Sequence, residues 1–107
     1  MAQLDKTFGG SSSGINTFFF VSQSITPAAL AASLGMKEEA YTITGAPAML
    51  TTDLCFVTAP PGAVQANCGV VAARVSSATQ ITNIYANLTA AANVPTAGVY
   101  SWWIVRP

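Results

Sequence analysis

The side chains able to do acid–base or nucleophilic chemistry are few in this 107-residue chain, and histidine is absent. Without histidine, neither a serine nor a cysteine can be activated by the usual Ser-His or Cys-His pair. A mechanism based on paired carboxylates would have to use Glu38 and Glu39, or the isolated Asp53. Adjacent side chains on a strand point to opposite faces, so Glu38 and Glu39 would not act together. The sequence therefore predicts a protein that is not an enzyme.

Metal and cofactor sites are not indicated either. Cys55 and Cys68 are the two cysteines, and two cysteines alone do not make a closed zinc site. They could form a disulfide, but in a chain made without secretion we expect buried free thiols. The glycine-serine run at residues 9–14 has no following lysine to bind phosphate, and Asn87-Leu88-Thr89 is a glycosylation acceptor only in a secreted protein. We expect no metal and no cofactor.

Charge is the unusual feature of the composition. Four acidic and four basic residues make up 7% of the chain and cancel, against about 25% charged residues in an ordinary soluble domain. A neutral balance argues against nucleic acid, which requires clustered lysine and arginine. No apolar run approaches the ~18 residues of a membrane span, and Asp5 and Lys6 are followed by glycine and serine instead of the apolar core of a signal peptide. We expect no nucleic-acid partner, no membrane and no secretion.

So little charge leaves a free monomer poorly protected against association. Either the surface is covered by uncharged polar residues, or much of it is buried against partners. The run Phe18–Phe20 and the pair Trp102-Trp103 favour the second interpretation, because large apolar patches usually mark interfaces.

The order of apolar runs predicts the fold. After residue 16, short runs rich in strand formers are separated by turn residues about every 8 to 14 positions, which is typical of an antiparallel β-sandwich. The runs are 18–24, 38–45, 53–59, 67–76, 79–87 and 99–106. We therefore expect an all-β sandwich domain, jelly-roll or immunoglobulin-like, over residues 17–107. Residues 1–16, polar and glycine-rich, are expected to form an extended N-terminal arm.

The last run is apolar on both faces. Val99, Ser101, Trp103 and Val105 alternate with Tyr100, Trp102, Ile104 and Arg106. One face can lie in the sandwich core, whereas the other needs a second layer that a domain of this size can hardly supply. A neighbouring subunit would provide it, and we expect a homotrimer with one tryptophan in the core and the other at an interface.

One segment carries helix signals instead of strand signals. Between residues 26 and 40, Thr26 is a possible N-cap, Pro27 suits the first helical position and Gly35 is a possible stop. Local propensity alone favours a short helix there.

From Ser24 to Arg106 the order of motifs resembles a family of small virion proteins of tailed bacteriophages. The motifs are SITP (24–27), YTITG (41–45), LCFVTAPPGA (54–63), GVVAARVS (69–76), YANLT (85–89), NVPTAG (93–98) and YSWWIVR (100–106). The chain departs from the family pattern after Gly45, where only Asp53 is kept of a Gly-Asp turn. The resemblance implies an extended segment at 26–37 in place of the helix.

The resemblance also implies a function. Such proteins are capsid decoration (cement) proteins, which bind the major capsid protein on the outside of the shell, or domains of head and tail fibres. We expect a decoration protein on the capsid exterior, made in the bacterial cytoplasm; the alternative is a fibre or spike head that binds a host receptor. The residues expected to contact partners are Phe18, Phe19, Phe20, Trp102, Trp103, Gly9, Gly10, Ser11, Ser12 and Ser13.

Overall fold

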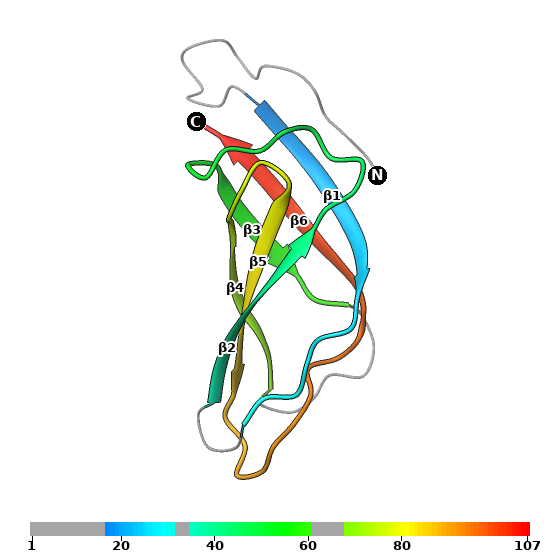
Figure 1. Cartoon of the computed structure of the whole chain (residues 1–107), viewed down its shortest axis with the longest axis vertical. Helices are drawn as coiled ribbons and strands as arrows, with labels where there is room; N and C mark the ends of the chain where they lie inside the picture. Colours follow the sequence, from blue (N-terminus) through cyan, green and yellow to red (C-terminus); the bar gives the residue numbers. More distant parts are fainter. Residues whose placement is uncertain (1–16, 32–34, 61–67) are drawn as a thin grey trace.

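The computed structural model of the chain describes residues 17–31, 35–60 and 68–107 (Figure 1). These residues form six β-strands and no helix. The strands are β1 (Thr17–Ile25), β2 (Gly35–Thr42), β3 (Leu54–Thr58), β4 (Cys68–Val75), β5 (Gln80–Asn87) and β6 (Gly98–Arg106). Every strand pairing is antiparallel. The all-β prediction is confirmed, and each strand overlaps one of the six apolar runs.

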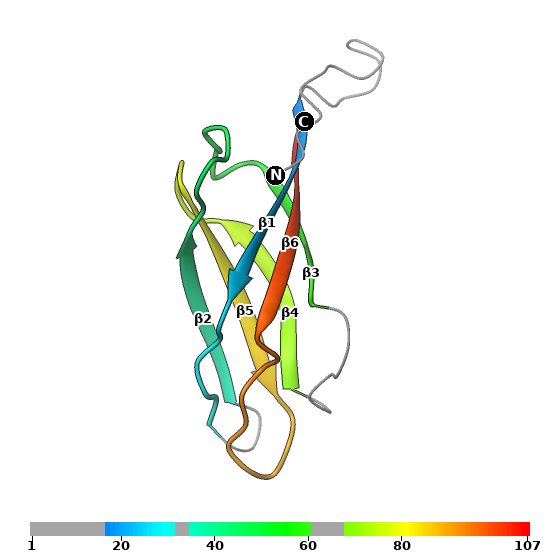
Figure 2. The ribbon, with the colours of Figure 1, turned by 90° about the vertical axis from the view of Figure 1, so that its right-hand side faces the viewer.

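The strands make two three-stranded sheets that lie face to face as a sandwich (Figure 2). Sheet 1 has the order β1-β6-β3 and sheet 2 the order β2-β5-β4. Every connection between consecutive strands passes from one sheet to the other, except the β4–β5 connection within sheet 2. The pairing of β1 with β6 thus encloses that of β2 with β5, which is the nesting found in jelly rolls.

Alternation along the strands places one face of each sheet in a shared core. Sheet 1 contributes Phe19, Val21, Ile25, Tyr100, Trp102 and Ile104 to this core. Sheet 2 contributes Cys68, Val75, Ile81 and Tyr85, and the connections add Leu30, Ile43 and Met49. Each of these side chains is buried, so the apolar residues of β1 and β6 that point inward are covered within the domain.

A chain of hydrogen bonds crosses this core from one sheet to the other. The Trp102 indole N–H donates to Asn83 Oδ1 at 2.8 Å, and Asn83 Nδ2 donates to the Tyr85 hydroxyl at 3.1 Å. The Tyr85 and Tyr41 hydroxyls are 2.7 Å apart, and Tyr41 donates to Glu39 Oε1 at 2.6 Å. Burial, and then the hydrogen bond to Glu39, raise the pKa of Tyr41 well above its usual range. Each polar group in this series of hydrogen bonds therefore has a partner, as a stable core requires.

The helix favoured by local propensity between residues 26 and 40 is not formed by the described residues there. The backbone N–H and C=O of Leu30 instead pair with Asn93, with N–O distances of 2.7 and 3.1 Å. Gly35 begins β2 and ends no helix. A Cβ at Gly35 would lie 2.3 Å from the carbonyl oxygen of Ala31, so a close backbone contact explains the glycine. Long-range pairing has overridden local propensity here.

The Asn-x-Thr sequence at the end of β5 has a structural role. Asn87 is fully buried, and its Nδ2 donates to the carbonyl oxygens of Ala31 and Ala91, each at 3.0 Å. Its Oδ1 accepts from the backbone N–H and the hydroxyl of Thr89, at 2.9 and 2.6 Å. All the hydrogen-bonding capacity of this side chain is used to hold two connections together.

An ion pair between the partly exposed Arg106 and the buried Asp53 lies at the end of β6. Arg106 donates from Nε to Asp53 Oδ1 and from one terminal nitrogen to Asp53 Oδ2, both at 2.8 Å. Asp53 Oδ2 also accepts the backbone N–H of Leu50 at 2.8 Å, and Arg106 donates to the carbonyl oxygen of Ala48 at 3.2 Å. This bidentate pair joins the last strand to the loop before β3.

Candidate functional site

The outward side chains of sheet 1 form a continuous apolar surface, which we call the aromatic face. The strand register places these side chains in two rows that cross all three strands. One row is Phe18, Val105 and Leu54, and the next is Phe20, Trp103 and Phe56. These six residues define the aromatic face.

Trp103 lies at the centre of the aromatic face. Its ring centroid is 5.0 Å from that of Phe18 and 4.8 Å from that of Phe20, in tilted and edge-on arrangements that aromatic pairs prefer. Phe56 is 57% exposed, Leu54 50% and Trp103 36%. The rings thus hold one another in place while much of their surface faces solvent in the single chain.

The strands of sheet 1 carry one charged residue, Arg106, which is bound to Asp53. The row next to the aromatic face is polar but uncharged and consists of Ser22, Ser101 and Thr58. The Ser22 and Ser101 hydroxyls are 2.9 Å apart and hydrogen-bonded to each other. Sheet 1 therefore presents apolar and hydroxyl groups without any charge to repel a similar surface.

The outer face of sheet 2 is different in character. Arg74 of β4 donates to Glu38 of β2 across the middle strand, and both side chains are more than half exposed. Thr82 of β5 lies opposite both Ala40 and Arg74 in the register. Met36 is a large exposed apolar residue of this face, at 66%. The outer face of sheet 2 therefore has the charged and polar character of an ordinary solvated surface.

Of the residues that the sequence indicated as partner contacts, Phe18, Phe20 and Trp103 come together on the aromatic face. Phe19 and Trp102 do not lie on it, because they point into the core with exposed fractions of 1% and 0%. The opposite orientation of the two tryptophans agrees with the alternation expected from the last strand. Gly9, Gly10, Ser11, Ser12 and Ser13 lie outside the described residues.

The partner contacts expected from the sequence did not include Leu54, Phe56 or Val105, although the alternation of the last run had put Val105 on the same face as Trp103. The alternation in LCFVT did show that Leu54 and Phe56 share one side of a strand, opposite Cys55 and Val57. It did not show which side faces the core, since both are apolar. That assignment follows only from the pairing of β3 with β6.

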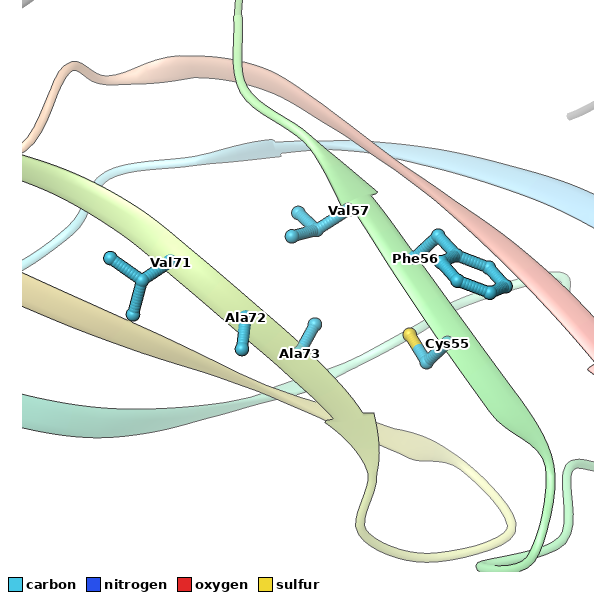
Figure 3. A pocket seen from close by; sticks show the side chains of 6 residues that line it. All are labelled: Cys55, Phe56, Val57, Val71, Ala72 and Ala73. Atoms are coloured by element: carbon cyan, nitrogen blue, oxygen red, sulfur yellow. The ribbon is translucent and has the colours of Figure 1, made fainter.

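A groove of about 310 Å³ lies between the edges of β3 and β4 (Figure 3). It is lined by Cys55, Phe56, Val57, Val71, Ala72 and Ala73. The Cys55 thiol points toward β4 and Ala73 (Figure 3). Burial raises the pKa of this thiol to about 12, so it stays protonated at neutral pH. Because the thiolate is the reactive form, the groove has no nucleophile.

This environment predicts slow thiol chemistry in the folded protein. At pH 8 and without denaturant, we expect Cys55 to react with a disulfide reagent at least about a hundredfold more slowly than an unperturbed thiol. Cys68 is buried, and burial raises the pKa of its thiol as well. Absorbance of the released thiolate gives the rate, and the same protein in denaturant is the control. Rapid modification of either cysteine in the folded state would contradict the described burial.

Among the described residues, no group of three or more histidine, cysteine or acidic side chains is placed to hold a metal ion. None of the described segments is a helix long and apolar enough to cross a membrane. Comparison with protein-family models, curated proteins and solved structures found no match to this chain. Function therefore has to be inferred from the residues and their geometry.

Proposed function

We propose that this protein is a structural virion protein, a capsid decoration protein that binds the outer surface of a phage head and stabilises the shell. The observation that carries the proposal is the aromatic face, an uncharged apolar surface on a domain with very little charge of its own. The motif order from Ser24 to Arg106 supports the choice of a virion protein. The major capsid protein is the proposed partner.

The size of the aromatic face fits attachment by many weak contacts. If each of the six side chains has a total surface of about 150–250 Å², their exposed surface adds up to an area on the order of 400 Å². A stable complex of two proteins usually buries about 800 Å² per partner. One such contact is therefore weak alone, but repetition over a symmetric shell multiplies its effect. Contacts that exist only in the assembled shell stabilise that shell by mass action.

The state of the acidic side chains supports a structural role over catalysis. Each acid that the structure describes is engaged in a local contact: Asp53 with Arg106, Glu38 with Arg74, and Glu39 with Tyr41. None of these carboxylates lies beside a serine or cysteine, and the Tyr41 hydroxyl that donates to Glu39 stays protonated because burial raises its pKa. We propose that the protein has no catalytic activity.

Binding to shells tests the proposal. Shells assembled from the major capsid protein encoded in the same genome are mixed with the purified protein, and the bound fraction is measured by cosedimentation. We expect hundreds of copies per shell, and shells that resist a higher temperature when decorated. Phe56→Ser and Trp103→Ser should each weaken binding by at least about tenfold, because each removes a large part of a small contact.

Met36→Ser is the matched control, since it also removes a large exposed apolar side chain but from the outer face of sheet 2. It should bind shells like the unchanged protein. Equal losses for Met36→Ser and Phe56→Ser would show that the aromatic face has no special part in attachment. A few dozen copies or fewer per virion, together with binding to host cells, would favour the fibre or spike alternative.

A further inference from the structure

The two sheets leave four edge strands, and three of these edges carry features that discourage strand pairing. β2 has the consecutive charged residues Lys37, Glu38 and Glu39. In β4 the register is interrupted between Val70 and Ala72. β3 has only five residues. Charge, irregularity and shortness are the usual means by which natural edge strands avoid joining other sheets.

The fourth edge, β1, has none of these features. It has nine residues, with no charged residue, no proline and no glycine. Its register with β6 runs without interruption from Thr17 to Ile25. Of the described strands, β6 is the one that pairs with it. A long, regular and uncharged edge is the structure to which a further strand adds most readily.

We propose that two copies of this chain pair through their β1 edges, antiparallel along Phe19–Ile25 and centred on Ser22. A two-fold axis through Ser22 places Phe20 opposite Ser24 of the second copy, and Val21 opposite its Gln23. Residues facing each other in this register have the same orientation, so both cores lie on the same side of one six-stranded sheet. The paired surfaces are uncharged, so a two-fold contact of identical edges meets no electrostatic repulsion.

Pairing through β1 would also place the two aromatic faces on the same side of one sheet. In a sheet with the strand order β3-β6-β1-β1-β6-β3, the two aromatic faces would lie on either side of the axis, with the row of Ser22 and Ser101 of each copy between them. The two faces together offer on the order of 800 Å² on one side of the pair, which is the area that one partner usually contributes to a stable protein interface. One copy alone offers about half of this area, and that shortfall favours a second copy as the occupant of the β1 edge.

This pair differs from the homotrimer expected from the sequence. A two-fold contact between identical edges closes on itself after two copies, whereas a three-fold assembly needs two different surfaces on each copy. The mass of the protein in solution decides between them. Dimer formation is measured without shells. The protein can therefore prove monomeric while attachment through the aromatic face holds, or prove dimeric while that attachment fails.

Charge at the centre of the proposed contact provides the test. Ser22→Lys would place two lysines opposite each other across the axis, and like charges at directly opposed positions destabilise strand pairing. We expect the unchanged protein to sediment as a dimer at micromolar concentration, and Ser22→Lys to raise the dissociation constant by up to about fivefold. Ser22→Glu should do the same. An equimolar mixture of the two variants should form a dimer again.

The mixture separates loss of pairing from loss of folding, because a misfolded variant would not be rescued by its opposite charge. Thr58→Lys is the matched control, since Thr58 is exposed in the same row of the same sheet but on β3. This variant should remain dimeric. A monomer or a trimer for the unchanged protein, a dimer of undiminished affinity for Ser22→Lys, or a mixture that stays monomeric would each overturn the proposal.

Discussion

Replacement of Trp102 by alanine is expected to lower the free energy of unfolding by about 3–5 kcal/mol, the usual cost of removing a large buried aromatic side chain. Trp102 is fully buried, so alanine would leave a cavity that is enclosed on all sides by the core. Alanine would also leave Asn83 Oδ1 without the indole N–H that it accepts at 2.8 Å. Because a domain of this kind has about 5–15 kcal/mol of stability in total, the variant should unfold at a much lower denaturant concentration.

Two further variants show which part of the effect comes from packing. Trp102→Phe keeps an aromatic ring but loses the N–H group, and we expect a smaller cost of about 1–3 kcal/mol from the unsatisfied buried amide of Asn83. Trp103→Ala removes the same side chain from the aromatic face and should cost only about 1 kcal/mol in the single chain, chiefly its contacts with Phe18 and Phe20. Chemical denaturation followed by far-ultraviolet circular dichroism measures all three. Equal costs at positions 102 and 103 would contradict their placement on opposite faces of β6.

Replacement of Arg106 by methionine is expected to cost about 3–5 kcal/mol, because it leaves the buried carboxylate of Asp53 without its cation. The Asp53 side chain is fully buried, whereas that of Arg106 is 28% exposed. Arg74→Met is the matched control, since it breaks the ion pair with Glu38 on the solvated face of sheet 2. An exposed pair of this kind contributes about 0–1 kcal/mol. A similar loss in both variants would show that the Asp53 pair is not specially stabilising.

The stability of the unchanged protein and that of Arg106→Met should also change in opposite directions as the pH falls. Burial by itself would raise the pKa of Asp53, but the hydrogen bonds from Arg106 and Leu50 outweigh burial and hold this pKa below its ordinary value. The stabilisation by Asp53 is therefore complete above the unfolded pKa of about 3.9 and is lost as the pH falls through the lower folded value. Without Arg106, burial should raise the pKa of Asp53, so the carboxyl stabilises below the unfolded pKa and loses this effect as the pH rises. The difference in unfolding free energy between the unchanged protein and Arg106→Met should shrink as the pH falls from 6 to 3.

The sequence was informative about the properties that are set by neighbouring residues. Apolar runs separated by turn residues located all six strands, and alternation with period two placed Trp102 and Trp103 on opposite faces of the last one. The structure puts Phe18 and Phe20 on one side of β1 and Phe19 on the other, whereas the partner contacts expected from the sequence included all three. Strands and their faces depend on neighbouring residues only, because a side chain points away from the side chains next to it whatever the strand pairs with.

The tertiary structure alone decided which faces and which strands come together. Phe56 joins Phe20 and Trp103 because β3 and β1 pair with opposite edges of β6. No local pattern indicates that β6 lies between them. The same holds for Asp53, whose partner Arg106 is 53 positions away, and for Gly35, which begins a strand because the backbone of Ala31 passes close to it. These contacts depend on the free energy of the whole sandwich, in which burial of both sheets in one core outweighs the helix propensity of residues 26–40.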